Sequence, residues 1–383
     1  MKPERQRALL DKYLQFKTGE WSDVADSCMR NPASAYVDPK RFECEMRVLF
    51  RERPVPVGLS CECSEPGSYL TANVGGLPIA VVRQGDGTLR GLVNACRHRG
   101  APVLSGNGGG LKALVCPYHA WSYKLDGTAL GRPQEWGFDD VPRSECNLSQ
   151  VAVAEQYGLI YVQPNARGPI SIDNVLEGMQ TEIAEYDLPK YSHFETRSRE
   201  WNFNWKLILD TFTENYHIPS LHRRSIAPYY DDRHSIWDTY GLHQRTVNFR
   251  RSIDRELEKP QADRLILPHT TIEYFLLPNA LLTHQLDHLE LWRVTPLAVD
   301  RCIVSTSLYA PEPVTSDAAK KHWKKNLDML LQVTETEDFP MMANIHAALA
   351  SGALKEVIYG RIEPALSFFH QSLNQLVGQS GEA

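Results

Sequence analysis

Two short pairs of cysteine and histidine constrain this chain more than any other feature of its sequence. Cys96 and His98 form a C-x-H pair, and Cys116 and His119 form a C-x-x-H pair. Each pair directly follows a segment with strand character, LRGLVNA before the first and LKALV before the second. The glycines and the proline between the pairs suit tight loops. Two loops from neighbouring hairpins can close over one metal centre, so the spacing predicts a metal site in a small β structure.

Three interpretations fit these four residues. They can be unrelated, because a buried free cysteine behaves as a small hydrophobic residue. They can form a structural Cys2His2 zinc site, because zinc accepts both ligand types. They can hold a Rieske [2Fe–2S] cluster, in which two cysteines bind one iron and two histidines bind the other. Four such residues at this spacing favour a metal over chance, and the pattern alone leaves zinc and the cluster open.

The composition is that of a globular protein and excludes several other classes. The 383 residues carry 41 Lys+Arg and 47 Asp+Glu, a net charge of −6, which argues against a nucleic-acid-binding protein. Eight cysteines are too few for a disulfide scaffold. The sequence has no apolar run of membrane-spanning length, and its first residues lack the apolar core of a secretory signal. We therefore expect a cytoplasmic protein with reduced thiols.

The hydrophobic pattern divides the chain into three parts. Residues 1–45 indicate a helix and loops, and residues 46–165 indicate short strands joined by Asp-Gly hairpin turns. Residues 166–383 combine strand-like alternation, mainly over 270–310, with helical periodicity at 172–186, 204–222, 316–350 and 363–377. The predicted fold class is therefore α+β, with a small all-β domain and a larger domain in which long helices accompany an antiparallel sheet.

A second set of potential metal ligands lies in the segment NWKLILDTFTENYHIPSLH. Glu214 and His217 are three residues apart and share one face of the predicted helix. His222 follows Pro219, where this helix should end, and can fold back towards His217. Two histidines and one carboxylate form the facial triad that holds non-heme Fe(II). Without the upstream Cys/His pairs, these histidines would be interpreted as surface residues at a helix end.

Together the two sets resemble the Rieske non-heme iron oxygenases, the aromatic-ring-hydroxylating oxygenase α subunits. The segments CRHRG, CPYHAW and LDG resemble the Rieske domain of that family, and NWK with Glu214, Tyr216, His217 and His222 resembles its catalytic domain. The resemblance covers most of residues 45–375. It implies a Rieske domain, a helix-grip-type catalytic domain and an N-terminal helical segment packed on the latter, over 46–165, 166–383 and 1–45, respectively.

The resemblance also implies the cofactors and their ligands. A [2Fe–2S] cluster is expected on Cys96, His98, Cys116 and His119. A mononuclear Fe(II) is expected on His217, His222 and a carboxylate from a helix near the C-terminus. Asp338 is the favoured third ligand, and Glu335 and Glu337 are close rivals. No bound flavin or NAD is expected, because no GxGxxG motif follows a strand.

In the family that the chain resembles, a carboxylate carries electrons between subunits. Carried over to this sequence, the path runs from His119 through Glu214 to His217 of the neighbouring subunit in a trimer or a multiple of trimers. Glu214 is therefore the candidate catalytic residue. An NAD(P)H-dependent reductase, acting directly or through a ferredoxin, is the expected redox partner.

The sequence does not determine the substrate. The resemblance favours hydroxylation or oxidative demethylation of an aromatic or other apolar organic molecule. The alternative is a quaternary ammonium compound, because relatives of that type also carry Glu at the position of Glu214 and aromatic side chains can surround a cation. A Rieske protein that only transfers electrons is a further alternative, but it would need only residues 46–165.

Four residues are candidates for the substrate pocket, namely Phe212, Tyr274, His284 and Trp292. His284 and His288 are also expected to point the same way, because side chains on a strand repeat every two residues. If that face lines the pocket, both histidines could touch the substrate.

Overall fold

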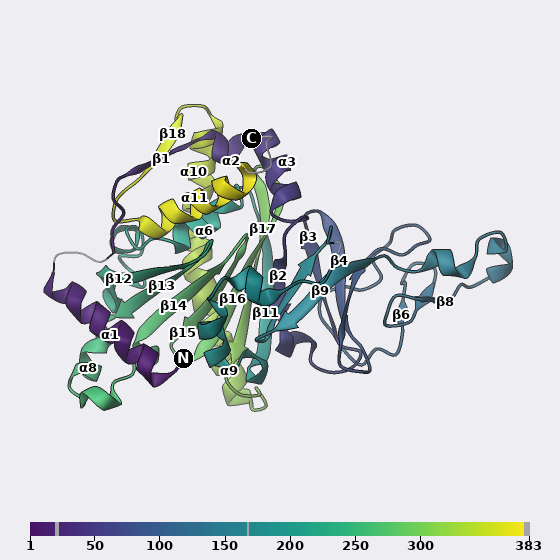
Figure 1. Ribbon diagram of the computed structural model, residues 1–383, viewed down its shortest axis with the longest axis horizontal. Helices are drawn as coiled ribbons and strands as arrows, with labels where there is room; N and C mark the ends of the chain where they lie inside the picture. Colours follow the sequence, from purple (N-terminus) through teal and green to yellow (C-terminus); the bar gives the residue numbers. More distant parts are fainter. Residues whose placement is uncertain (20–22, 167, 379–383) are drawn as a thin grey trace. The chain divides into compact units, whose positions relative to one another are not determined.

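The computed structural model describes residues 1–19, 23–166 and 168–378 (Figure 1). The chain forms two compact units. The smaller comprises Met46–Val175 and Asp187–Pro189, and the larger comprises Met1–Glu45, Leu176–Tyr186 and Lys190–Ala383. The N-terminal segment thus belongs to the same unit as the C-terminal half. The smaller unit ends at Val175, beyond the boundary near residue 165 that the sequence indicated.

The smaller unit is built from two antiparallel sheets. Six strands pair in the order β2-β10-β9-β5-β4-β3, and three short strands pair in the order β6-β7-β8. Their bounds are β2 (Val55–Leu59), β3 (Tyr69–Val74), β4 (Leu77–Arg83), β5 (Leu89–Val93), β6 (Leu114–Val115), β7 (Ser122–Tyr123), β8 (Ala129–Gly131), β9 (Gln150–Gln156) and β10 (Leu159–Gln163). Both predicted hairpin turns are present. Gly87 and Gly127 take φ values of 85° and 87°, a region that glycine adopts without a steric penalty.

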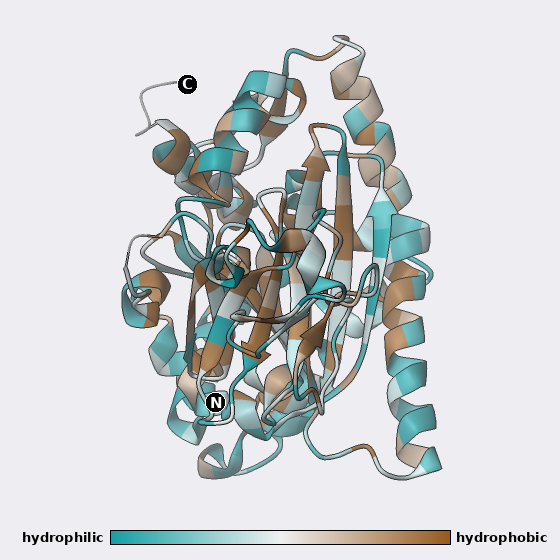
Figure 2. Ribbon diagram, turned by 90° about the vertical axis from the view of Figure 1, so that its right-hand side faces the viewer, coloured by the Kyte–Doolittle hydropathy of each residue, from teal (hydrophilic) through white to brown (hydrophobic). Residues whose placement is uncertain are grey.

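The larger unit is organised around a seven-stranded antiparallel sheet in the order β11-β17-β16-β15-β14-β13-β12. The strands are β11 (Ser192–Trp201), β12 (Tyr230–Tyr240), β13 (His243–Arg250), β14 (Thr270–Leu276), β15 (Ala280–Gln285), β16 (His288–Ala298) and β17 (Arg301–Ala310). Apolar residues gather along these strands and on the helices that pack beside them (Figure 2). A separate ribbon pairs β1 (Met29–Pro32) with β18 (Glu356–Tyr359), which come from opposite ends of the chain.

The helices follow the periodicity of the sequence with three interruptions. They are α1 (Pro3–Thr18), α2 (Ser34–Val37), α3 (Pro39–Val48), α4 (Ile172–Leu176), α5 (Gln180–Ile183), α6 (Lys206–Phe212), α7 (Ile218–Leu221), α8 (Asp254–Leu257), α9 (Asp317–Val333), α10 (Phe339–Ala350) and α11 (Pro364–Gly378). The predicted helix at 172–186 is divided into α4, α5 and a 3-10 turn. The helix at 204–222 divides into α6 and α7, because Pro219 can only occupy a first turn. A π-helical turn, Thr334–Asp338, separates α9 from α10.

The α+β fold class predicted from the sequence is confirmed. None of the helices in the described part of the chain has the length and apolar character needed to cross a membrane.

The NWK motif fixes the start of α6 to the N-terminal segment. Asn204 donates hydrogen bonds from its side chain to the carbonyl oxygens of Tyr36, at 2.9 Å, and Val299, at 2.8 Å. Glu45 accepts from Trp205 Nε1 at 3.1 Å and from Lys206 Nζ at 2.7 Å. Lys206 and Glu45 are both fully buried, so the Lys206 charge depends on Glu45, which also pairs with Arg41 at 2.9 Å.

This buried pair gives a testable prediction for stability. In Glu45→Ala the Lys206 ammonium would remain buried without a carboxylate, which costs about 3–5 kcal/mol. We expect the midpoint of thermal unfolding, followed by circular dichroism, to fall by several degrees. The double variant Glu45→Leu/Lys206→Met should recover most of that loss, because it removes both buried charges. Glu356→Ala, which breaks an exposed pair with Arg30, is the control and should change the midpoint little. Equal losses in Glu45→Ala and Glu356→Ala would contradict the prediction.

Candidate metal centres

The two Cys/His segments of the smaller unit fold into equivalent loops. In the first loop the Cys96 amide donates to the carbonyl of Ala101, and the Gly100 amide donates to the carbonyl of Cys96, both at 2.8 Å. In the second loop, Cys116 donates to Trp121 at 2.8 Å and Ala120 donates to Cys116 at 3.0 Å. The fifth residue of each loop, Gly100 or Ala120, has positive φ, at 77° and 57°. The same backbone turn therefore presents one cysteine and one histidine from each loop.

The four donor groups are sorted by type. Cys96 and Cys116 are buried, and their thiols lie within hydrogen-bonding reach of each other. His98 and His119 face each other with their Nδ1 atoms 3.1 Å apart. Burial raises the pKa of the Cys96 thiol, so its thiolate needs a nearby cation. Two sulfurs on one side and two imidazole nitrogens on the other fit a [2Fe–2S] cluster with one iron for each pair.

Aromatic side chains hold one of the histidines in place. Trp121 stacks on the His98 ring with centroids 5.1 Å apart, and Phe138 packs its edge against both rings. The guanidinium of Arg132 lies 5.7 Å from the Trp121 centroid. His119, by contrast, is exposed and contacts only the rings of His98 and Tyr118 in the described part of the chain. His119 is therefore the solvent-facing edge of this centre.

The larger unit brings together His217, His222 and Asp338. His217 directly precedes α7, His222 directly follows it, and Asp338 ends the π-helical turn. Asp338 Oδ1 lies 3.1 Å from His222 Nε2 and 3.7 Å from His217 Nε2. Ligand atoms of the three residues all lie within 4.8 Å of one another. The arrangement unites the two ends of α7 with a residue of the π-helical turn that lies 116 positions beyond His222.

The chemistry of these three groups fits a bound cation. The Asp338 side chain is only 4% exposed, and its Oδ1 accepts no hydrogen bond of ordinary geometry from any residue that the structure describes. Burial alone would lower the pKa of His222, but the carboxylates of Asp338 and Glu337 raise it, so the site favours positive charge. Two imidazoles and one carboxylate are the donor set of non-heme Fe(II) sites with open positions.

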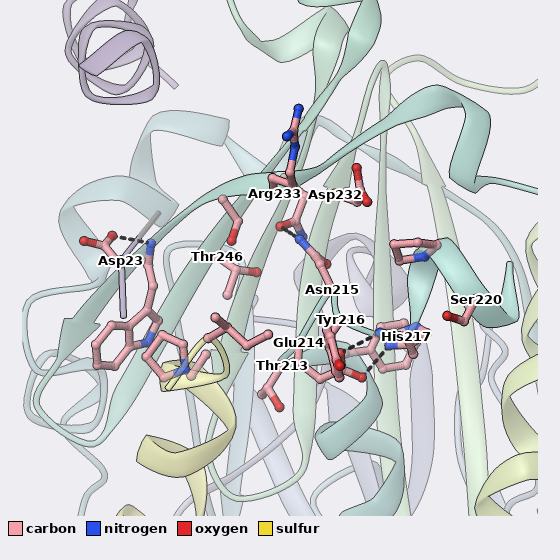
Figure 3. A pocket seen from close by; sticks show the side chains of 18 residues that line it. Asp23, Thr213, Glu214, Asn215, Tyr216, His217, Ser220, Asp232, Arg233 and Thr246 are labelled. Atoms are coloured by element: carbon pink, nitrogen blue, oxygen red, sulfur yellow. Dashed lines mark hydrogen bonds and ion pairs between the residues drawn. The ribbon is translucent and has the colours of Figure 1, made fainter. Parts of the chain in front are cut away.

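A carboxylate outside this set orients each histidine. Glu214 Oε1 is hydrogen-bonded to His217 Nδ1, and Glu214 Oε2 accepts the His217 amide at 3.0 Å (Figure 3). Glu337 Oε2 lies 2.6 Å from His222 Nδ1 and also accepts from Ser225 Oγ at 2.7 Å. Each Nδ1 is thereby occupied, and each Nε2 faces Asp338. Such outer hydrogen bonds set the ring orientation and the basicity of metal-binding histidines.

The structure assigns different surroundings to the three acidic residues that competed for the third ligand position. Asp338 faces both imidazoles, Glu337 contacts the far nitrogen of His222, and Glu335 pairs with Arg199 at 2.7 Å. The sequence analysis missed the contact of Glu337 with His222. The sequence shows only that Glu337 is next to Asp338. Because neighbouring residues of a regular α-helix point about 100° apart, it gives no reason to expect both at one histidine ring.

A cavity of about 740 Å³ lies beside His217 in the larger unit. Figure 3 shows Glu214, Asn215 and His217 on one side of it and Thr246 of the sheet on the other. Its aromatic lining consists of Phe212, Tyr216 and Trp237, and its carboxylates are Asp23, Glu214 and Asp232.

The predicted pocket residues divide between the two faces of the sheet. Phe212 lines the cavity and packs on Trp292 with ring centroids 5.0 Å apart. Tyr274 and His284 share the opposite face, where the Tyr274 hydroxyl contacts Tyr186 at 3.1 Å and the His284 ring lies 5.4 Å from the Tyr186 ring. These two predictions are corrected: the side chains alternate along β14 and β15, and these two residues fall on the face away from Trp292.

The expectation that His284 and His288 point the same way is also wrong. A hairpin turn separates them, so they lie on different strands, and His288 is paired with Gln285 rather than aligned with His284. His288 shares the face of Trp292.

Comparisons with known proteins agree with this arrangement. Residues 188–379 match the family described as the ring hydroxylating alpha subunit (catalytic domain), and residues 53–142 match the Rieske [2Fe-2S] domain. The glycine betaine monooxygenase oxygenase subunit of Chromohalobacter salexigens is 29% identical over 79% of this chain and 77% of its own length. The carnitine monooxygenase oxygenase subunit of Escherichia coli K12 is 31% identical over 55% of this chain and 58% of its own length.

Solved structures show the same fold. The crystal structure of a quaternary ammonium Rieske monooxygenase in complex with its substrate L-carnitine has a TM-score of 0.77, with 20% sequence identity. The alignment covers 92% of this chain and 96% of the other. The catalytic-domain match covers half of the chain, and the Rieske match covers the loops that carry the four cysteine and histidine donors. The chain therefore belongs to the Rieske non-heme iron oxygenases, the ring-hydroxylating α subunits that carry a [2Fe–2S] cluster and a mononuclear iron.

Proposed function

We propose that this protein is the terminal oxygenase of a system that oxidises a quaternary ammonium compound at a carbon next to the cationic nitrogen. The observation that carries this proposal is the cavity beside His217, whose described lining combines three aromatic residues and three carboxylates with a single basic residue, Arg233. Aromatic faces and carboxylates are the groups that attract a cation without hydrogen-bond donors. The relatives named for glycine betaine and carnitine support the same substrate class.

Each metal centre would have its own set of protein ligands. Cys96, His98, Cys116 and His119 would hold the cluster, and His217, His222 and Asp338 would hold Fe(II). The mononuclear iron would supply O2 activation beside the substrate. Glu214 and Glu337 keep both Nε2 atoms directed at Asp338, and the aromatic lining of the cavity excludes water and positions the cation.

The overall reaction balances with two electrons and two protons. One oxygen atom of O2 enters a C–H bond next to nitrogen, and the other leaves as water. The C–N bond at the hydroxylated carbon then breaks, which releases a tertiary amine, a carbonyl compound and a proton.

The electrons would come from an NAD(P)H-dependent reductase, directly or through a ferredoxin. We propose that they pass from His119 of one subunit through Glu214 to His217 of the next, within a homotrimer or a multiple of it. Two observations support this path. His119 is the exposed edge of the cluster site, and Glu214 is bonded to His217 while its side chain keeps 12% of its surface exposed.

A substrate panel tests the proposed reaction. The purified holoenzyme with a surrogate reductase should consume NADH and O2 in the presence of trimethylammonium compounds such as glycine betaine, carnitine or choline. Amine and carbonyl products, identified by mass spectrometry, should form in step with O2 consumption. Aromatic acids and hydrocarbons form the competing arm of the panel. Coupled turnover of an aromatic substrate, with none of any quaternary ammonium compound, would refute the proposal and favour the substrate class expected from the sequence.

The His217→Ala variant tests the assignment of the two centres. Removing one imidazole from the facial set should release the mononuclear iron, while the red-brown cluster absorption persists because its ligands lie in the other unit. Iron content and the visible spectrum give both results from one sample. His322→Ala, which removes an exposed histidine of α9, should retain all the iron. Loss of the cluster absorption in His217→Ala would argue against two independent centres.

The Glu214→Gln variant tests the electron path. The amide preserves the size of the side chain but removes the charge that holds His217 Nδ1–H. We expect both metals to remain bound and turnover to fall by about 10- to 100-fold, the loss typical when a hydrogen-bond partner of a metal-bound histidine is removed. Glu335→Gln changes an acid in the π-helical turn that pairs with Arg199 and should leave turnover near the wild-type value. Undiminished coupled turnover in Glu214→Gln would remove Glu214 from the path.

A further inference from the structure

One buried carboxylate beside the cavity has no cationic partner. Glu273 lies on β14, and the strand register places it directly between Thr246 of β13 and Thr283 of β15. It therefore projects from the same face of the sheet as Thr246, Asn248 and Trp292. The residue is only 7% exposed.

Two residues that line the cavity hold this carboxylate. Thr246 Oγ1 donates to Glu273 Oε2 at 2.8 Å, and Asn248 Nδ2 donates to the same oxygen at 2.9 Å. Asn248 in turn accepts from Asn215 Nδ2 at 2.6 Å, which fixes the orientation of its amide. Within the described residues, Glu273 Oε1 has no hydrogen-bond partner. One oxygen is thus held by two residues of the cavity wall, which place Glu273 directly behind that wall.

Other buried acids of this unit are neutralised, and Glu273 is not. Glu182 pairs with Arg245 at 2.6 Å, and Glu45 pairs with Lys206 at 2.7 Å. Glu290, in the same row of the sheet, contacts His288 at 3.2 Å and Trp292 Nε1 at 3.1 Å. Burial, together with the charge of Glu290, raises the pKa of Glu273 to about 8, so the empty site holds it largely protonated at neutral pH, and a cation bound beside it would favour the ionised form. Thr283, which lies between the two glutamates, also has a buried hydroxyl without a partner. This row of the sheet therefore contains the carboxyl group of Glu273 and the unbonded hydroxyl of Thr283. No described residue places a positive charge next to Glu273.

We propose that Glu273 recognises the cationic nitrogen of the substrate and selects cations over uncharged molecules of the same shape. This inference rests on the proposed function and names the residue that confers its substrate class. A trimethylammonium group has no N–H to donate, so only charge and aromatic faces can hold it. A carboxylate in a water-poor site attracts such a charge far more strongly than one in bulk water. Phe212 and Trp237 line the same cavity and supply the aromatic faces.

Matched pairs of ligands isolate the role of charge. Choline and 3,3-dimethylbutan-1-ol differ only in nitrogen against carbon, as do glycine betaine and 3,3-dimethylbutanoate. Binding to the holoenzyme is measured without O2 by isothermal titration calorimetry, and the ratio of the two dissociation constants in each pair is the readout. For the wild-type protein we expect the cation to bind at least about tenfold more tightly.

Three variants complete the experiment. Glu273→Gln keeps an acceptor for Thr246 and Asn248 but no charge, so the preference for the ligand with the cationic nitrogen should fall at least about tenfold, while its carbon analogue should bind no more weakly than to the wild-type protein. Glu273→Asp retains the charge and should keep most of the preference. Glu256→Gln changes a buried acid that pairs with Lys259 away from the cavity, and should leave the ratio unchanged.

The outcomes separate this inference from the proposed function. If the wild-type protein oxidises and prefers the cations but Glu273→Gln keeps the full preference, the role of Glu273 is wrong and the proposed function stands. If the wild-type protein shows no preference within either pair, the role of Glu273 is wrong, and the proposed function is then decided by the substrate panel alone.

Discussion

The catalytic unit depends on one electrostatic constraint, a buried carboxylate held against two imidazoles. Among the described residues Asp338 Oδ1 has no hydrogen-bond donor of ordinary geometry, and a buried anion without full compensation costs several kcal/mol, a large part of the stability of a domain. A divalent cation between Asp338, His217 and His222 removes that cost. The surrounding contacts hold the Asp338 carboxylate and the two imidazoles close together without a bound metal.

Those contacts come from distant parts of the chain. The Glu45–Lys206 pair fixes the start of α6, and α6 leads to the segment of Glu214 and His217. The π-helical turn at Thr334–Asp338 brings two consecutive acids to opposite nitrogens of one ring, Glu337 to Nδ1 and Asp338 to Nε2 of His222. Turns of this kind are common at functional sites because they redirect side chains within a helix.

Much of this organisation was predictable from local patterns. The Cys/His spacing, the Asp-Gly turns and the i, i+3 relation of Glu214 to His217 are encoded within a few residues, and the fold class followed from the strand-like alternation and helical periodicity of longer segments. Contacts that depend on register were not predictable. The alternation of β14 and β15 decides that Tyr274 and His284 face away from Trp292, and a hairpin separates His284 from His288. The contact of Glu337 with His222 likewise requires the π-helical turn, and no residue type in the sequence predicts such a turn.

Asn248 joins the sheet to the metal-binding segment through two hydrogen bonds, because it donates to Glu273 and accepts from Asn215. Asn215 is the residue that follows Glu214 in the chain. Hydrogen-bonded amides polarise one another, so a negative charge on Glu273 strengthens both bonds of this relay. The charge of Glu273 thus acts on hydrogen bonds that reach Asn215. Asn215 is one residue from Glu214, the carboxylate bonded to His217.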